Sequence, residues 1–291
     1  MANGIIIIDK PREWTSQDVT ARLRRVFGTK RIGHGGTLDP MATGVLPVFV
    51  GRATRAVEFF EHAQKEYIAT LRLGLLTDTE DTSGRILEER EVHVTKEDVE
   101  RVLLSFLGEQ EQIPPMYSAI KVNGQKLYQL ARAGKEVERQ PRKIEIYALE
   151  LLEADGNDYS IRVSCSKGTY IRTLCKDIGM ALGCGGCMAA LRRSKAGEYS
   201  LADAVPLAEL LEKSDRGENV EALLLPVESM FKNHPALELT PKQEKAVRNG
   251  ASFTLPVEAG DYRLYGKGEF LALGHCDGQT MSVIKSFFEV S

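Results

Sequence analysis

The hydrophobic positions of the first hundred residues follow two different spacings. Residues 5–8 are four consecutive isoleucines, a short β-branched run that predicts a buried strand. Thr15 or Ser16 can cap a helix whose apolar residues recur at helical spacing up to Phe27, and Gly28 can end it. Residues 67–73 alternate as in a half-buried strand, and the capping box at 95–98 begins a second predicted helix.

The middle of the chain contains a segment of different character. Residues 112–143 carry seven basic side chains, and the pair Asn123-Gly124 between two short alternating runs is a strong hairpin signal. We interpret this segment as a basic protrusion. Strands are predicted over 144–152 and 159–165, followed by a helix that begins near Gly168 and includes Arg172.

The last third changes texture once more. Residues 212–221 form an acidic, linker-like stretch, and short strand-like segments follow at 262–265, 270–274 and 282–288. This predicts a small all-β module over residues 236–291. Strands first, capped helices between them and further strands afterwards favour an α+β fold, with a mixed, largely antiparallel sheet flanked by helices.

Composition and charge refine this picture. The chain has 291 residues, 43% of them hydrophobic, and no apolar run approaches the ~18 residues that cross a bilayer, so we expect a cytoplasmic protein without membrane contact. The net charge of −3 argues against a nucleic-acid partner. However, residues 1–55 carry nine basic and four acidic side chains, and residues 121–195 carry fourteen and eight. Two basic blocks are therefore hidden by acidic ones.

Five cysteines in a chain without an export signal do not predict structural disulfides. Cys184 and Cys187 have the CxxC spacing of a zinc or redox pair, but the sequence offers no second pair. We interpret them as ordinary buried thiols. The sequence also lacks nucleotide-binding glycine motifs, zinc-hydrolase and deaminase motifs and a serine nucleophile elbow.

The remaining chemical candidate is the glycine-rich loop at 33–44, which holds His34 and Asp39. A carboxylate can act as a nucleophile or as a general base when a partner holds it in place. Pro40 restricts the backbone of Asp39 to extended geometry. The plain alternative, that Asp39-Pro40 only starts a turn and His34 only caps a loop, stays open from spacing alone.

The loop Gly33-His-Gly-Gly-Thr-Leu-Asp-Pro40 resembles the G-H-x-G-x-L-D-P signature of the TruB family of pseudouridine synthases. Further motifs of the family occur between residues 4 and 232, in the order in which the family has them. The last fifty-odd residues resemble a PUA-like RNA-binding domain. These motifs are Lys10-Pro11 with Thr15-Ser16, Lys65-Glu-Tyr67, Leu73-Gly74 with Thr77-Asp-Thr79, Gln112-Ile-Pro-Pro-Met-Tyr-Ser-Ala119, Cys165-Ser-Lys-Gly-Thr-Tyr-Ile-Arg172 and Leu191-Arg-Arg193.

The resemblance implies isomerisation of uridine to pseudouridine at position 55, in the T loop of tRNA, without a cofactor or metal. It implies a catalytic domain over 1–232 with a basic RNA-binding insertion at about 112–143, and an RNA-binding domain over 236–291. It implies that Asp39 is the catalytic residue and that Arg172 is its ion-pair partner in catalysis. Tyr67 would act in the site by stacking on the base, and His34 would flip it. Tyr170 and Leu191 would line the pocket, and Lys10 would support the catalytic loop or meet phosphate, although a solvent-facing lysine is equally compatible.

Two departures from the family pattern stand out. Glu13 replaces the usual glycine of K-P-x-G-x-T-S, which puts the path of that loop in question, and Gly186 replaces a small alanine. Two rival functions remain open: a non-catalytic RNA-binding or tRNA-chaperone protein, and an enzyme guided by a separate RNA, whose expected basic tails are absent. We expect a monomer that needs no protein partner.

Overall fold

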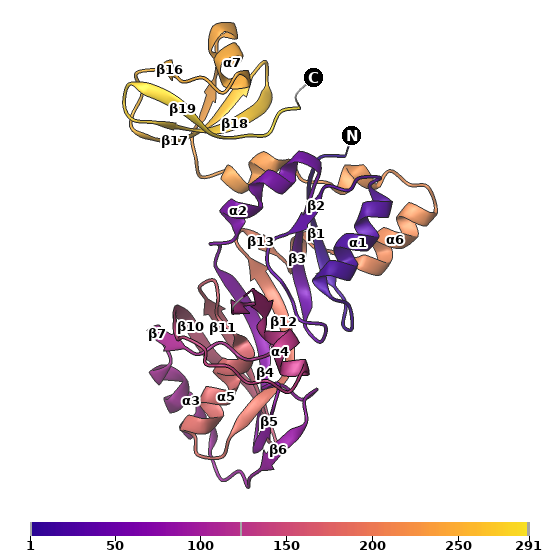
Figure 1. The fold of residues 1–291 in the computed structure, drawn as a ribbon, viewed down its shortest axis with the longest axis vertical. Coiled ribbons are helices and arrows are strands. Elements are labelled where there is room, and N and C mark those ends of the chain that lie inside the picture. Colours follow the sequence, from indigo (N-terminus) through magenta and orange to yellow (C-terminus); the bar gives the residue numbers. More distant parts are fainter. Residues whose placement is uncertain (1, 123, 290–291) are drawn as a thin grey trace.

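The computed structural model describes residues 2–122 and 124–289. Figure 1 shows an elongated arrangement in which the C-terminal residues form a separate sheet at one end of a longer body. The body is built on a ten-stranded sheet, and the C-terminal part on a five-stranded sheet.

The ten-stranded sheet is mixed and largely antiparallel, as predicted. Only β1 with β14 and β3 with β12 pair in parallel along its main path. Two strands lie off that path: β2 (Ile32–His34) pairs with β3, and β13 (Tyr199–Ser200) with β12. The main path runs β14 (Val205–Pro206), β1 (Gly4–Lys10), β3 (Thr43–Val50), β12 (Gly186–Ala196), β4 (Lys65–Leu73), β11 (Asp158–Cys165), β10 (Arg142–Asp155) and β7 (Gly108–Gln112).

Four helices share one hydrophobic core with the sheet: α1 (Ser16–Val26), α3 (Lys96–Ser105), α5 (Ile171–Ala181) and α6 (Leu207–Asp215). Side chains of a strand alternate between faces, so Ile6 and Ile8 of β1 join this core while Ile5 and Ile7 face the other side. There they meet the segment that contains α2 (Val57–Phe60). The prediction of an α+β fold is confirmed.

The predicted capping box at Thr95 is present, and Thr15, one of the two predicted caps of the first helix, forms a second one. Thr15 accepts from the Asp18 backbone and Thr95 from the Asp98 backbone, and each aspartate side chain accepts from the backbone of its cap.

The described part of the body also contains four short 3₁₀ helices: η1 (Gly51–Ala56), η2 (Leu201–Asp203), η3 (Val220–Leu223) and η4 (Val227–Phe231).

The segment after β7 pairs β8 (Lys121–Val122) with β9 (Gln125–Lys126), but Asn123 of the predicted turn lies outside the described residues. Helix α4 (Leu127–Arg132) follows and was not predicted.

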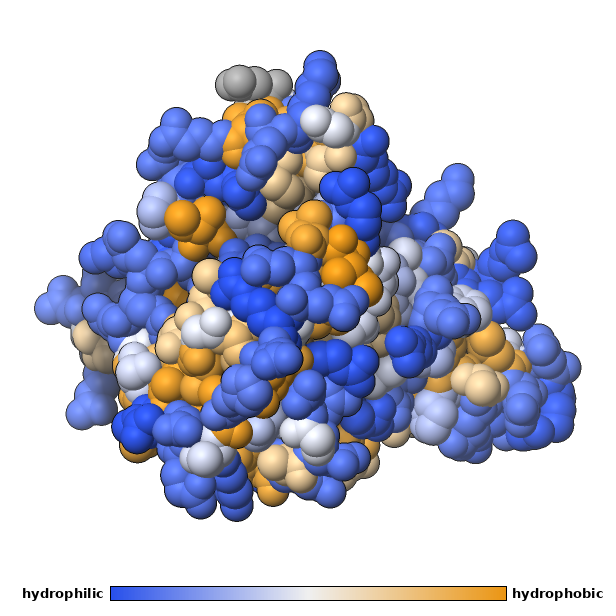
Figure 2. All heavy atoms as spheres, turned by 90° about the horizontal axis from the view of Figure 1, so that it is seen from below, coloured by the Kyte–Doolittle hydropathy of each residue, from blue (hydrophilic) through white to orange (hydrophobic). Residues whose placement is uncertain are grey.

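A second hairpin joins β5 (Leu75–Thr77) to β6 (Ile86–Glu89) at the lower end of Figure 1. Figure 2 views the molecule from that end, where hydrophobic and hydrophilic residues are intermixed.

The C-terminal sheet contains β15 (Ala236–Glu238), β17 (Gly260–Gly266), β18 (Glu269–Cys276), β19 (Thr280–Ser286) and β16 (Phe253–Thr254), in that spatial order. The predicted short strands are present. The module also contains helix α7 (Pro241–Arg248), so its description as all-β needs correction. The acidic stretch at 212–221 is not simply a linker either, because its first residues complete α6.

Aromatic side chains join this module to the body. The ring of Phe231 in the body lies 6.1 Å from that of Phe270 and 5.7 Å from that of Phe287, both in the module. Lys285 of β19 also forms an ion pair with Glu58 of α2. The module therefore packs against η4 and α2, the segments that share a hydrophobic cluster with Ile5 and Ile7 of β1.

Candidate active site

Asp39 lies in the loop between β2 and β3, and the start of α1 fixes that loop. Ser16, which is fully buried, accepts a hydrogen bond from the backbone N–H of Leu38 at 2.9 Å and donates its hydroxyl to the Leu38 carbonyl at 3.2 Å. The Glu13 N–H donates to the Pro40 carbonyl at 2.7 Å. The residues on both sides of Asp39 are thus tied to one neighbouring segment.

Lys10, at the end of β1, is a further contact of this loop. Its side chain is fully buried, and Nζ donates to the carbonyls of Trp14 at 2.6 Å, Pro11 at 2.8 Å and Pro40 at 3.4 Å. Burial lowers the pKa of Lys10 to about 8, although the nearby Asp39 carboxylate acts in the opposite direction. The alternative of a solvent-facing lysine is therefore wrong.

Glu13 shows how the departure from the family glycine is accommodated. Its backbone has φ 70°, in the left-handed region that glycine adopts without strain. A non-glycine residue pays roughly 1–2 kcal/mol for this geometry. The loop thus keeps a glycine-like turn at this position, with the strain offset in part by the Glu13–Pro40 hydrogen bond.

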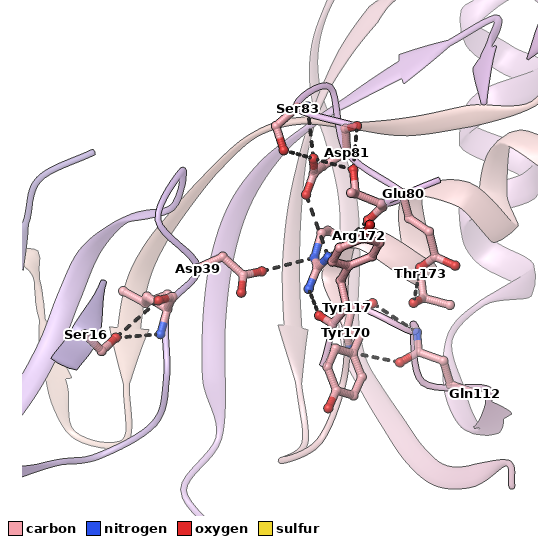
Figure 3. Close-up of polar contacts among 12 residues, drawn as sticks. Ser16, Asp39, Glu80, Asp81, Ser83, Gln112, Tyr117, Tyr170, Arg172 and Thr173 are labelled. Carbon is pink, nitrogen blue, oxygen red and sulfur yellow. Dashed lines mark hydrogen bonds and ion pairs between the residues drawn. The ribbon is translucent and has the colours of Figure 1, made fainter. Parts of the chain in front are cut away.

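Arg172 approaches Asp39 from the first turn of α5. Its Nε lies 3.0 Å from Oδ2 of Asp39, while Nη1 donates to the Thr79 carbonyl at 3.0 Å and Nη2 to the Tyr117 carbonyl at 2.8 Å. The Arg172 side chain is 7% exposed and that of Asp39 is 40% exposed. The buried guanidinium therefore positions a carboxylate that remains accessible to a substrate (Figure 3).

A second carboxylate, which the sequence analysis did not identify, lies on the other side of Arg172. Oδ2 of Asp81 is 3.7 Å from Nη1 of Arg172, and this side chain is also 7% exposed. Oδ1 of Asp81 accepts from Thr79 and from both the backbone and the hydroxyl of Ser83. Figure 3 shows the guanidinium between Asp39 and Asp81.

The neighbouring Glu80 ties the same turn to α5. Its carboxylate accepts from Thr173 at 2.5 Å and from Lys176 at 2.6 Å. The turn after β5 is thus joined to the first two turns of α5.

Tyr170 is the N-cap of α5 and is held through its backbone. Gln112, at the end of β7, accepts from the Tyr170 N–H at 2.8 Å and donates to its carbonyl at 3.1 Å. Burial raises the pKa of the Tyr170 phenol, with Asp39 acting in the same direction and Ser118 and Arg172 opposing it. Tyr170 therefore lies within the electrostatic reach of Asp39.

Tyr67 and Leu191 come from two adjacent central strands. Tyr67 on β4 pairs in register with Arg193 on β12, and Leu191, 9% exposed, pairs with Ala69. Burial raises the pKa of Tyr67, Arg193 opposes that rise, and Asp39 adds to it. Tyr67 thus lies beside Arg193 in the sheet, and the charge of Asp39 reaches its phenol.

His34 ends β2 rather than lying in an open loop. Its Nε2 is 3.3 Å from the side-chain amide of Gln17 on α1, and its Nδ1 is buried with no hydrogen-bond partner among the described residues. Burial and the charge of Arg193 lower the pKa of His34, which favours the neutral imidazole. A neutral ring is compatible with contact to a nucleobase.

The described residues contain no group of three or more His, Cys, Asp or Glu side chains that could hold a metal ion. Cys184 and Cys187 are buried free thiols. No helix in the described ranges is long and apolar enough to cross a membrane.

Family models and named relatives match most of this chain. Residues 24–171 match the family model of the TruB family pseudouridylate synthase N-terminal domain, and residues 172–232 match the tRNA pseudouridylate synthase B C-terminal domain. The chain is 44% identical to tRNA pseudouridine synthase B of Aromatoleum aromaticum, over 96% of this chain and 90% of that protein. It is 40% identical to the protein of the same name from Clostridium kluyveri, over 98% and 99%.

Two solved structures superpose on most of this chain. A chain in the crystal structure of a Cbf5-Nop10-Gar1 complex superposes with a TM-score of 0.76 at 28% identity, covering 99% of this chain and 85% of that one. A chain in an H/ACA RNP bound to a substrate RNA containing 2′-deoxyuridine gives a TM-score of 0.75 at 26% identity, over 99% and 86%.

Proposed function

We propose that this chain, which belongs to the TruB family of pseudouridine synthases, isomerises uridine 55 in the T loop of tRNA. The relatives from Aromatoleum aromaticum and Clostridium kluyveri are both named tRNA pseudouridine synthase B and align over nearly their whole length. The observation that carries the proposal is the accessible Asp39 carboxylate held at 3.0 Å by the buried Arg172.

The chemistry matches a carboxylate of this kind. The bond between N1 of uracil and C1′ of the ribose breaks, the base turns, and a bond forms between C5 and C1′. C5 then loses its proton and N1 gains one, so the product is an isomer of the substrate. Asp39 acts either as the nucleophile at C1′ or as the base that removes a proton from C2′. Both routes need an ionised carboxylate at a fixed angle, and Arg172 supplies the fixed partner.

The target base must leave the T loop before Asp39 can reach its sugar. In our proposal His34 fills the space that the flipped uridine leaves, which offsets part of the few kcal/mol of unstacking. Tyr67 stacks on the extruded uracil, since aromatic stacking is a common way to hold an unpaired base. Tyr170 and Leu191 close the pocket around it. Lys10, which contacts the Pro40 carbonyl, positions the loop.

We also propose a division of labour along the chain. Residues 1–232 form the catalytic domain, with the insertion at about 112–143 contacting the T arm through its basic side chains. Residues 236–291 form the RNA-binding module. The enzyme acts as a monomer without a protein partner or guide RNA. The much higher identity to the tRNA pseudouridine synthase B proteins than to the chains of the Cbf5 complexes favours this over the guided alternative.

The test is a turnover assay with purified protein and an unmodified tRNA transcript, in which pseudouridine is located by carbodiimide modification and primer extension. We expect conversion at position 55, and none in a transcript with cytidine at that position. Modification at a different uridine would contradict the position. Tight binding without any pseudouridine would instead support the non-catalytic RNA-binding alternative. A bare T-arm stem-loop shows whether recognition needs the rest of the tRNA.

A further inference from the structure

Arg193 is a buried cation directly beneath the catalytic loop. It lies on β12, opposite Tyr67 of β4 on one side and Gly44 of β3 on the other. Its side chain is 1% exposed, Nε donates to the Val45 carbonyl at 2.6 Å, and Nη2 donates to the Gly36 carbonyl at 3.2 Å. The guanidinium is therefore fixed between the start of the loop and the strand that leaves it.

The charge of Arg193 has no carboxylate partner. The ion pairs within residues 2–122 and 124–289 include Arg172 and Arg192 but not Arg193. A buried charge without a counter-charge is costly, even when carbonyl groups accept its hydrogen bonds. A negative charge that arose nearby during the reaction would offset this cost.

The surroundings of Arg193 strengthen the case. Lys65, 8% exposed, and Lys10 are also buried close to this guanidinium, and Arg193 lowers the pKa of both lysines and of His34. Burial, and to a lesser degree the charges of Arg193 and Lys167, lower the pKa of Lys65 to about 8, so a lysine here loses part of its charge near neutral pH. An arginine stays protonated under the same conditions. Position 193 is thus suited to a permanent positive charge.

The isomerisation supplies a matching negative charge. When the N1–C1′ bond breaks, its electron pair stays with the base, so uracil becomes an anion until C5 bonds to C1′. This holds whether Asp39 attacks C1′ or removes the C2′ proton. Tyr67, on which we propose that the uracil stacks, is the cross-strand neighbour of Arg193, and such neighbours have Cβ atoms about 5 Å apart.

We propose that the Arg193 guanidinium, supported by Lys65, stabilises the uracil anion that forms after the glycosidic bond breaks. This rests on the function proposed above and adds the group that compensates the leaving base. A unit charge about 7 Å away, at an effective dielectric constant of about 20, changes a rate by about 50-fold. A purely structural arginine, which only holds the Gly36 and Val45 carbonyls, would have no preference for one leaving base over another.

The test compares two tRNA transcripts, with uridine or with 5-fluorouridine at the target position. Fluorine withdraws electrons, so the 5-fluorouracil anion needs less stabilisation from the protein. We measure single-turnover loss of the starting nucleoside for wild type, Arg193→Gln and Arg193→Lys. Arg193→Gln should slow the uridine reaction by about 50-fold and the 5-fluorouridine reaction clearly less, and Arg193→Lys should restore part of the rate.

Arg192→Gln is the matched control, because it removes an equal charge from the adjacent residue of β12, whose partner is Asp9. It should affect both substrates by the same factor. Equal slowing of both substrates by Arg193→Gln, in a variant with wild-type circular dichroism and tRNA affinity, would overturn the proposal. If Arg193→Gln does not fold, Lys65→Gln must show the same preference at smaller amplitude, and its absence would overturn the proposal as well. A wild type that converts no uridine would refute the proposed function instead.

Discussion

Replacing Asp81 with asparagine removes one of the two carboxylates beside Arg172 while keeping nearly the same side-chain shape. At the observed 3.7 Å between Oδ2 and Nη1, the Coulomb energy is about 4 kcal/mol at an effective dielectric constant of about 20. This is an upper value, because Arg172 keeps Asp39 and the carbonyls of Thr79 and Tyr117. We therefore expect the free energy of unfolding to fall by about 2 kcal/mol.

The effect on activity should be larger than the effect on stability. Without Asp81 the guanidinium can shift toward Asp39, and misplacement of a catalytic group by about 1 Å costs on the order of 100-fold in rate. Urea unfolding and single-turnover pseudouridine formation measure the two effects. The control is Asp158→Asn, which breaks the exposed pair with Arg72 and should cost less than about 1 kcal/mol with no loss of rate. Wild-type turnover in a folded Asp81→Asn protein would show that Arg172 holds Asp39 in place without Asp81.

Three further substitutions test the loop. Lys10→Met removes a lysine whose pKa is about 8 in the folded chain, against the ordinary lysine value of 10.5 that applies once the chain unfolds. Between these two pH values the unfolded wild-type chain binds more protons than the folded one. The free energy of unfolding of wild type should therefore rise by about 3 kcal/mol relative to that of the variant as pH rises from 8 to 10.5; a difference that stays constant in urea unfolding would contradict this. Glu13→Gly should raise the free energy of unfolding by up to about 1 kcal/mol because it relieves the φ of 70°, whereas Glu13→Ala should not; a loss of stability in the glycine variant would count against strain. Gly44→Ala places a Cβ against the Arg193 backbone carbonyl, closer than van der Waals contact allows, and should lower the free energy of unfolding by about 3 kcal/mol. The control is Gly217→Ala, whose Cβ meets no atom within 4 Å and which should lower it by about 1 kcal/mol.

Local signals made much of the fold predictable. The isoleucine run at 5–8 and the alternation at 67–73 became β1 and β4, and the capping boxes at Thr15 and Thr95 begin α1 and α3. These signals work because strand alternation and helix caps depend on residues only a few positions apart. The same kind of signal was available for α7, which Thr240 caps with Pro241 at its first turn.

The partners of Arg172 were not predictable in this way. Asp81 and Tyr117 lie far from Arg172 in the sequence and meet it only through the turn after β5 and the segment after β7. Periodicity describes which face of an element is apolar and carries no information on contacts between distant elements. Arg193 was part of a family motif, but nothing local distinguishes a buried arginine from its neighbour Arg192, whose side chain is 42% exposed.

In the proposed function, the Asp39 carboxylate performs the chemistry while the rest of the site binds and positions the uridine. Single-turnover pseudouridine formation in a tRNA transcript, measured for wild type and Asp39→Asn together with tRNA affinity, tests it most directly. We expect the variant to bind tRNA with nearly unchanged affinity and to form no detectable pseudouridine. Formation at the wild-type rate in Asp39→Asn would contradict it.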